Sequence, residues 1–457
     1  TLEEAKKIYA EKYQRSADEV VLKQDEDCLD TWFSSWLWPF EVFKGLSKPG
    51  NAELAYYYPT NTLVTAPEII FFWVARMIMA GMEYQKQIPL REVYFTGIVR
   101  DKQGRKMSKS LGNSPDLLAL IDQYGADAVR FGIMIASPAG NDLLWDESSN
   151  EQGRNFCNKM WNALKLIKMW ENNPNGINTP EHSSATDAQT YFACYWFEQR
   201  FAAAKEEVDK LMKQFRLSEA LKTIYTLIWD DFCSWYLEWT KPAFGAPTDA
   251  HLLAKTKEYF SLLMQILHPY MPFITEEIYH LLSERNDDLC VKQWAPAASQ
   301  TTTQDHWLAQ GEQLKKIISG LRDGRNKLNL KPKDPIRLSV LSSNPALFQH
   351  TEKILLKQVN ATSLVITNEP IAGAATIVVA QDKFFIEAEA LNDTGAQKES
   401  LKKELEYLEG FLISVSKKLE NERFVQNAKP EVVDAERKKK ADTEAKIQTI
   451  RESLAHL

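Results

Sequence analysis

The chain has 457 residues, of which 44% are hydrophobic and 26% charged, and its formal net charge is −7. This composition is typical of a soluble protein of several domains, and no apolar run is long enough to cross a bilayer. The negative net charge argues against indiscriminate nucleic-acid binding, which depends on neutralisation of phosphates by Lys and Arg, so a nucleic-acid partner would need local basic patches.

The first residues of the chain have a mixed-charge helical pattern without the basic start and apolar core of a signal peptide, which favours a cytoplasmic protein. The five cysteines are widely scattered along the chain: Cys28, Cys157, Cys194, Cys233 and Cys290. Because none forms a CxxC pair or a Cys/His cluster of zinc spacing, we expect no disulfide framework, no metal site and no zinc or organic cofactor.

Residues 1–142 are predicted to form a first domain in which short β-rich runs, such as residues 93–99, alternate with apolar helices. That alternation favours an α/β sheet with crossover helices. The apolar run at residues 69–75 is followed by Arg76 and predicts a buried helix.

Residues 143–300 are predicted to be an all-α bundle, because amphipathic stretches rich in Trp, Leu and Phe follow one another between turn signals such as residues 172–176. Residues 301–395 follow as a small α+β unit. It begins with a helix near residues 314–327 and continues with strand-like runs at residues 336–341, 363–367, 375–380 and 383–388.

The last segment, residues 396–457, carries a heptad pattern. Apolar residues recur there at alternating steps of four and three: Leu401, Leu405, Leu408, Leu412, Val415 and Leu419. A second periodic helix follows the break before Pro430, so an antiparallel coiled-coil hairpin is predicted.

One loop in the first domain concentrates the residues suited to chemistry. Residues 97–113 follow a predicted strand and precede a helix starting near Pro115, and they contain glycines, small hydroxyls and a dense set of cations. Lysine ammonium groups and backbone N–H groups at strand ends suit a polyphosphate ligand. An arbitrary Lys-rich loop of this kind is more often a solvated basic turn.

The five residues at the centre of this loop are Lys106-Met107-Ser108-Lys109-Ser110. They match the KMSKS signature of class I aminoacyl-tRNA synthetases letter for letter, and the chain resembles that family. The resemblance implies the second half of a Rossmann-like α/β catalytic domain, with an anticodon-binding bundle after it. It also implies that the loop binds ATP with its Mg²⁺, and that Lys106 and Lys109 are catalytic, Lys109 stabilising pyrophosphate charge during attack on the α-phosphate.

Two further segments resemble the valyl branch of this family: residues 27–35, with the run Asp30-Thr31-Trp32-Phe33-Ser34-Ser35, and residues 68–77. Ile69 and Trp73 are spaced i, i+4 and would share one helical face, and with Trp32 they would line an apolar slot for a branched aliphatic side chain. The simpler alternative is that all three are core residues. Relatives commonly have Gly-x-Asp where this chain has Ala66-Pro67-Glu68, so the expected contact to the ATP ribose falls to the longer Glu68.

By the same resemblance the partners are L-valine, ATP and tRNA(Val), with no membrane, and the protein is expected to be a monomer. The C-terminal hairpin would bind the tRNA elbow through basic clusters; the alternative is a salt-bridged solvent face. The residues that form those clusters are Lys402, Lys403, Arg437, Lys438 and Lys439.

The histidine signature of the class I family has no counterpart here, because the first histidine of the chain is His182. We therefore expect the chain to hold half of the catalytic fold, without the editing domain, and to be inactive by itself. Two alternatives remain at this stage: a fragment of an isoleucyl-type synthetase, and a non-catalytic tRNA-binding protein with a relic loop.

Overall fold

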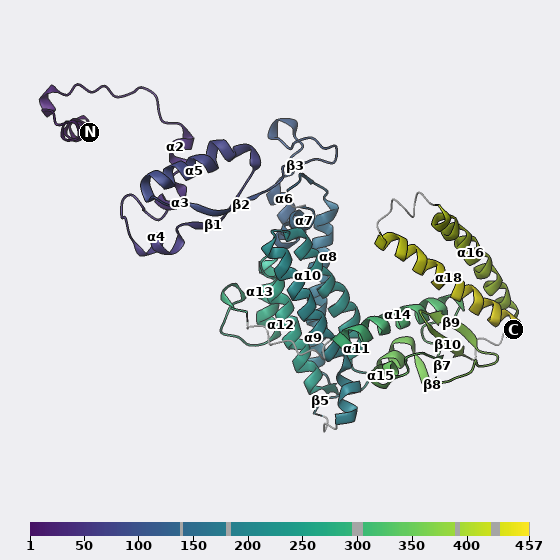
Figure 1. Cartoon of the computed structure of the whole chain (residues 1–457). Coiled ribbons are helices and arrows are strands. Elements are labelled where there is room, and N and C mark those ends of the chain that lie inside the picture. The colour runs from purple at the N-terminus through teal and green to yellow at the C-terminus, as the bar shows by residue number, and fades with distance from the viewer. Residues whose placement is uncertain (138–139, 180–183, 295–304, 389–393, 422–429, 457) are drawn as a thin grey trace. The chain divides into compact units, whose positions relative to one another are not determined.

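The computed structural model describes residues 1–137, 140–179, 184–294, 305–388, 394–421 and 430–456 (Figure 1). The chain forms two compact units, one of residues 1–114 with 137–145 and one of residues 115–136 with 146–457. The protein is multidomain and mostly helical, with small sheets. Among the described residues, no helix combines the length and apolarity needed to cross a membrane.

The sheets of the first unit are two parallel pairs of strands. β1 (Thr60–Thr65) pairs with β2 (Leu90–Phe95), and β3 (Val99–Arg100) pairs with β4 (Leu143–Leu144). The expectation of a single strand over residues 93–99 was wrong, because β2 ends at Phe95 and pairing resumes only at Val99. Gly97 lies in this break, and a Cβ atom there would fall 1.8 Å from the Asn141 carbonyl oxygen, so the two backbones approach too closely for a longer residue.

The other elements of the first unit are short helices. Their bounds are α1 Leu2–Tyr13, η1 Ala17–Glu19, α2 Thr31–Ser35, α3 Trp38–Glu41, α4 Ala52–Tyr57, η2 Pro67–Ile69, η3 Ile70–Val74, α5 Ala75–Ala80, η4 Gly81–Gln85 and η5 Lys109–Leu111. Side-chain caps begin several of them: Asp30 Oδ1 accepts from the N–H of Trp32 at 2.9 Å, and Asn51 Oδ1 from that of Leu54 at the same distance.

The predicted buried helix at residues 69–75 was wrong in both geometry and burial. Ile69 ends the 3₁₀ helix η2, and η3 is a π-helical turn, so Ile69 and Trp73 do not share the face of an α-helix. Phe71 is 83% exposed and Phe72 52% exposed, whereas Val74 and Met77 are buried. An apolar composition therefore does not show that every residue of this run is buried.

The second unit begins with a helical bundle. Its elements are α6 Leu117–Tyr124, α7 Ala126–Ile135, α8 Ser148–Glu171, α9 Ser184–Lys213, α10 Leu217–Thr226, the π-helical η6 Leu227–Tyr236, α11 Leu237–Thr240, α12 Ala250–Leu267 and α13 Pro272–Leu282. Two short strands, β5 (Ile177–Asn178) and β6 (Thr248–Asp249), pair in parallel, and the single-turn η7 (Leu289–Val291) follows α13. The largest fully buried side chains here are aromatic and include Trp196, Phe232 and Tyr236.

α14 (Asp305–Lys327) leads from this bundle into a four-stranded sheet with the strand order β8-β7-β10-β9. β7 (Ile336–Leu341) is parallel to β8 (Ala361–Ile366), and β10 (Asp382–Glu387) is antiparallel to β7 and to β9 (Ala375–Val379). α15 (Ala346–Val359) connects β7 and β8. Buried residues of the bundle, α14 and the sheet form one continuous core, so these parts stabilise one another.

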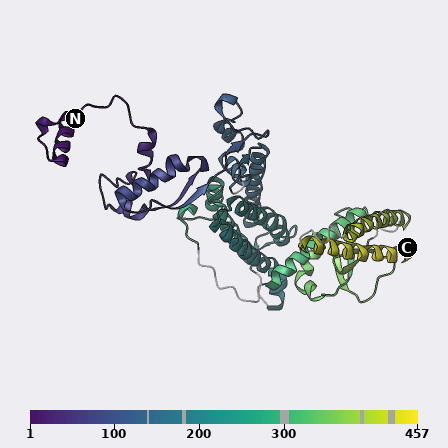
Figure 2. The same ribbon diagram turned by 45° about the horizontal axis from the view of Figure 1, so that its top comes forward.

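The chain ends with two long helices, α16 (Thr394–Glu420) and α18 (Pro430–His456), which Figure 2 shows side by side. Lys418 pairs with Glu436 at 3.2 Å and Arg451 with Glu409 at 2.6 Å, so the helices run antiparallel. Val415, Val433 and Ile447 are buried between exposed positions. The packing geometry of a coiled coil stays a prediction.

Candidate functional site

The loop that carries the Lys-Met-Ser-Lys-Ser run begins with a tight turn. After β3, the N–H of Asp101 donates to the Arg105 carbonyl at 2.9 Å, and that of Gly104 donates back to the Asp101 carbonyl at 2.8 Å. Gly104 has a φ of 78°, a conformation that glycine adopts without strain. The chain reverses there, so that Lys106 pairs with Arg100 in an antiparallel bridge.

The Asp101 carboxylate is the centre of this turn. Its Oδ1 accepts from the N–H groups of Gln103 and Arg105 at 3.1 and 2.9 Å, and its Oδ2 accepts from Arg105 Nε at 2.8 Å and Asn113 Nδ2 at 3.0 Å. Bonds to the charged form, led by that from Asn113, lower the pKa of Asp101 to about 2. The carboxylate is therefore ionised at neutral pH.

Asn113 ties the far end of the loop to its beginning. Its Nδ2 donates to Asp101 and, at 3.3 Å, to the Lys106 carbonyl, and its Oδ1 accepts from the N–H of Ser108 at 2.9 Å. The Ser108 and Ser110 hydroxyls lie 3.1 Å apart, and Ser108 Oγ accepts from the N–H of Leu111 at 3.3 Å. Asn113 had no assigned role in the sequence analysis, although its amide contacts both the first residue of the signature, Lys106, and the middle one, Ser108.

The base of the loop is fixed by Asp142, next to β4. Its Oδ1 accepts from the N–H of Ile98 at 2.9 Å, and its Oδ2 pairs with Arg100 Nε. The bond from Arg100 is the main cause that lowers the pKa of the Asp142 carboxyl. The loop thus starts from an anchored strand.

The predicted phosphate-binding residues lie on the outer part of the loop. Lys106 and Ser110 are exposed, and Met107 and Ser108 are half-buried. The backbone of Lys109 begins the 3₁₀ helix η5, but its side chain lies outside the described residues. A positive side chain and hydroxyl groups are therefore accessible beside a loop whose base is pinned.

The predicted amino-acid pocket residues are only partly brought together. Trp32 stacks on Phe72, with ring centroids 6.1 Å apart. Trp73 packs instead on the cluster of Val74, Met77 and Leu90, and within the described chain its buried Nε1 has no hydrogen-bond partner. Ile69 is half-buried at the end of η2.

Glu68 is exposed in the turn that directly follows β1. β1 and β2 are parallel and Thr65 pairs with Phe95, so their carboxyl ends share one edge of the sheet. The segment with Glu68 and the segment that leads to β3 both leave from this edge, which is where α/β sheets bind ligands.

The five basic residues predicted to bind tRNA are exposed on α16 and α18, and acidic partners are seen for Lys439 and Arg437. Lys439 pairs with the buried Glu436 at 2.9 Å, and Arg437 with Asp434 at 3.4 Å. Lys402 and Lys438 present charge on the helix surfaces.

Three family models match consecutive parts of the chain. The model "tRNA synthetases class I (I, L, M and V)" matches residues 1–146, and "Anticodon-binding domain of tRNA ligase" matches residues 194–341. "Valyl tRNA synthetase tRNA binding arm" matches residues 393–457. The chain is also 48% identical to a valine--tRNA ligase of Bacteroides fragilis over 438 residues, which are 95% of this chain and 49% of that protein.

The chain belongs to the valyl-tRNA synthetase family. A valine--tRNA ligase of Phocaeicola vulgatus is 47% identical over all of this chain and 51% of its own length. The chain thus spans about half the length of the curated relatives it matches.

Two solved synthetases are more distant. A leucyl-tRNA synthetase of Agrobacterium radiobacter K84, in a complex with tRNA and LeuAMS, gives a TM-score of 0.47 at 20% identity, covering 62% of this chain and 34% of that one. The methionyl-tRNA synthetase of Mycobacterium tuberculosis, with methionyl-adenylate, gives 0.42 at 22% identity, covering 54% and 48%.

Proposed function

We propose that this chain supplies the ATP-handling loop, part of the valine pocket and the tRNA-binding regions of a valine--tRNA ligase. Such an enzyme activates L-valine with ATP to valyl-adenylate and transfers the valyl group to tRNA(Val). The observation that carries the proposal is the loop at residues 106–110, an intact family signature anchored through Asp101 and Asn113 with Lys106 exposed.

The loop suits the first chemical step. A valine carboxylate oxygen attacks the α-phosphorus of ATP, which enters as its Mg²⁺ complex, and the bond to the departing pyrophosphate breaks. Negative charge grows on that leaving group, and the ammonium groups of Lys106 and Lys109 stabilise it more than they stabilise bound ATP. The pinned base holds the backbone of the loop in place, which lowers the cost of orienting cations that the loop carries.

Glu68 and the residues around Trp32 supply the second element of the proposal. We assign valine binding to Trp32, Ile69 and Trp73, whose apolar surfaces suit an isopropyl side chain. The exposed carboxylate of Glu68 at the edge of the sheet suits the ribose hydroxyls of ATP. Met107, Ser108 and Ser110 would line the phosphates from the loop.

The second unit supplies tRNA binding. We assign anticodon binding to residues 143–300, a linking role to residues 301–395, and contact with the tRNA elbow to residues 396–457, as an antiparallel coiled coil following the catalytic residues 1–142. Matches to an anticodon-binding model and to a tRNA-binding-arm model support these roles. Lys402, Lys403, Arg437, Lys438 and Lys439 are the assigned phosphate contacts on the arm.

A chimera tests the proposal directly. The matching region of the Bacteroides fragilis ligase is replaced by this chain, and valine-dependent exchange of pyrophosphate into ATP is measured. We expect activity with L-valine, little with L-isoleucine, and a loss of about 10²–10³ in kcat for Lys109→Ala, the size of effect seen when one charge-stabilising donor is removed. Lys102→Ala is the matched control, since it removes a neighbouring cation outside the signature.

The other outcomes decide between the alternatives. A chimera in which Lys109→Ala leaves the exchange rate unchanged would identify the loop as a relic and the chain as a tRNA-binding module. If the chimera exchanges pyrophosphate faster with L-isoleucine than with L-valine, the chain is assigned to the isoleucyl-type synthetases instead. This chain by itself is expected to show no exchange, because it has no histidine before His182 to contact the ATP phosphates.

A further inference from the structure

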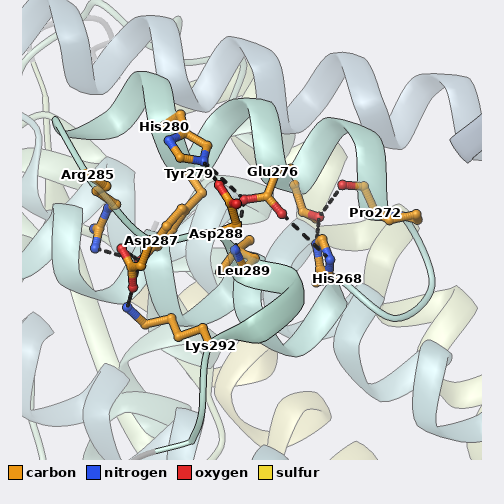
Figure 3. A network of polar contacts seen from close by, with 11 residues as sticks. His268, Pro272, Glu276, Tyr279, His280, Arg285, Asp287, Asp288, Leu289 and Lys292 are labelled. Atoms are coloured by element: carbon orange, nitrogen blue, oxygen red, sulfur yellow. Dashed lines mark hydrogen bonds and ion pairs between the residues drawn. The ribbon is translucent and has the colours of Figure 1, made fainter.

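A compact group of nitrogen and oxygen ligands lies in the helical unit, at a distance along the chain from the loop described above (Figure 3). Glu276 and His280 are one turn apart on α13, and Asp288 immediately precedes η7. His280 Nε2 lies 3.2 Å from Glu276 Oε1 and 3.0 Å from Asp288 Oδ1. The three ligand atoms all lie within 4.8 Å of one another.

His280 has too few N–H groups on this side of its ring to bond both carboxylates. One imidazole nitrogen faces two carboxylate oxygens, and an Nε2–H group can direct its single proton at only one of them. A divalent cation between the three atoms would accept one lone pair from each of them and would neutralise both carboxylates.

The neighbouring His268 lies against the other oxygen of Glu276. The Thr275 hydroxyl donates to the Met271 carbonyl at 2.7 Å, so its oxygen accepts from His268 Nδ1 at 2.9 Å. In the neutral ring Nε2 therefore carries a lone pair, and it faces the other Glu276 oxygen at 3.8 Å, beyond hydrogen-bond distance. Glu276 thus lies between two imidazole nitrogens.

The surrounding contacts hold these side chains in place. Glu276 Oε1 also accepts from the N–H of Leu289 at 2.8 Å, which fixes the carboxylate relative to η7. Asp287, next to Asp288, accepts from Tyr279 Oη at 3.0 Å and pairs with Lys292 at 3.2 Å, which anchors the connecting loop. Such secondary contacts are what orient the ligands of metal sites.

We propose that His280 Nε2, Glu276 Oε1 and Asp288 Oδ1 bind a divalent transition metal of the zinc type. Ligands about 2.0–2.1 Å from a tetrahedral Zn²⁺ lie about 3.3–3.4 Å apart, close to the separations from His280 seen here. The combination of imidazole and carboxylate favours Zn²⁺, Co²⁺ or Ni²⁺ over Mg²⁺ and Ca²⁺, which take oxygen ligands.

The site keeps one position open. It borders a hollow of about 490 Å³, which is also lined by His268, Phe273, Glu277 and Cys290. The side chains of His280 and Asp288 are 38% and 63% exposed, so an ion and a fourth ligand reach them from solvent. Water is the fourth ligand expected in the isolated chain.

The test uses the untagged 457-residue chain, freed of metal by dialysis against a chelator and titrated with Zn²⁺ against a chromogenic competitor. We expect one Zn²⁺ per chain at this site, and a Co²⁺ derivative with the visible absorption of tetrahedral nitrogen and oxygen ligation. His280→Ala should weaken the affinity at least about tenfold, because loss of even an outer-shell partner of a metal ligand usually costs that much. Glu277→Ala is the matched control, because it removes a carboxylate of the same helix and hollow that is not among the proposed ligands, and it should leave the affinity unchanged.

His280→Gln separates ligation from hydrogen bonding. Its amide can still donate to the carboxylates, so the metal-free variant should unfold at the same temperature as the metal-free parent chain but gain no stability from Zn²⁺. The proposal is wrong if His280→Gln and His280→Ala bind Zn²⁺ like the parent chain, or if the parent chain binds none. In either case the cluster is a hydrogen-bonded network only.

Discussion

The side-chain amide of Asn113 donates to Asp101 Oδ2 at 3.0 Å, closing residues 101–113 into one hydrogen-bonded loop. The same amide oxygen accepts from the N–H of Ser108, in the middle of the signature. A single side chain therefore couples the buried carboxylate of the turn to the segment that carries the two lysines.

Loss of this coupling is expected to slow catalysis without removing any group that touches ATP. In the chimera described above, Asn113→Ala should lower kcat for pyrophosphate exchange by about tenfold to 10²-fold, because misplacement of a catalytic group by about 1 Å has effects of this size. KM for valine should change little. Gln103→Ala in the same turn should leave both constants unchanged, since Gln103 contributes only its backbone N–H to Asp101. An unaltered kcat in Asn113→Ala would show that the loop is positioned without the hydrogen bonds of Asn113 to Asp101 and Ser108.

Asp101 makes the stability of the loop dependent on pH. Hydrogen bonds led by that from Asn113 lower its pKa to about 2, below the value of about 3.9 for an unfolded Asp. The stabilisation is therefore complete above about pH 4 and is lost as the pH falls from there through about pH 2. We expect the urea midpoint of the parent chain to exceed that of Asp101→Asn at pH 6, and the gap to close by about pH 2. A gap independent of pH would contradict the assignment, and Asp18→Asn serves as an exposed control.

Local sequence patterns predicted those elements whose formation depends mainly on the order of neighbouring residues. Periodic apolar residues located β7 at the bounds predicted, and placed β8, β9 and β10 within two residues. The Lys106 to Ser110 loop was found because its residues are contiguous. The helix at residues 69–75 was misjudged, because the π-helical turn and the exposure of Phe71 depend on tertiary packing that composition does not encode.

The sequence did not reveal the contact of Asn113 with Asp101 or that of Asp288 with His280. Both contacts form only when the chain folds. Asn113 reaches Asp101 across twelve positions through a turn, and Asp288 reaches His280 only because the connecting loop folds back over α13. No Cys or His spacing in the sequence marked this cluster. Spacing rules detect ligands that lie on one element or in a short motif, and they do not detect ligands that separate elements contribute.

α14 approaches α9 so closely that one of its glycines has no room for a side chain. A Cβ atom at Gly311 would fall 2.0 Å from Cδ1 of the fully buried Trp196. Gly311→Ala should therefore lower the free energy of unfolding by about 1–3 kcal/mol, the usual cost of overpacking a core. Gly410→Ala in α16 is the matched control: nothing lies within 4 Å of its Cβ position, so it should stabilise its helix by about 0.5–1 kcal/mol. Equal effects of the two substitutions in urea unfolding would contradict the close packing.

The exposed lysines of the C-terminal helices should contribute to tRNA binding through charge alone. Lys402→Glu and Lys438→Glu are each expected to weaken binding of a tRNA(Val) transcript and to lower the slope of log K against log salt by about 0.7–0.9, the value for one phosphate contact. Filter binding of the 457-residue chain at several salt concentrations measures both quantities. Lys7→Glu on α1 changes the net charge equally and should leave the slope unaltered.

Lys439 should behave differently from these residues because its ammonium group already has a partner. Lys439 pairs with the buried carboxylate of Glu436, which also pairs with Lys418. The hydrogen bond from Lys439 is the main cause that lowers the pKa of Glu436. Lys439→Glu places two carboxylates together, so it should lower the temperature at which α16 and α18 separate as well as weaken tRNA binding. Lys439→Gln keeps a donor for Glu436 and removes the charge. If that variant retains the thermal stability but binds tRNA with a shallower salt slope, Lys439 contacts phosphate; an unchanged slope assigns it to the helix pair alone.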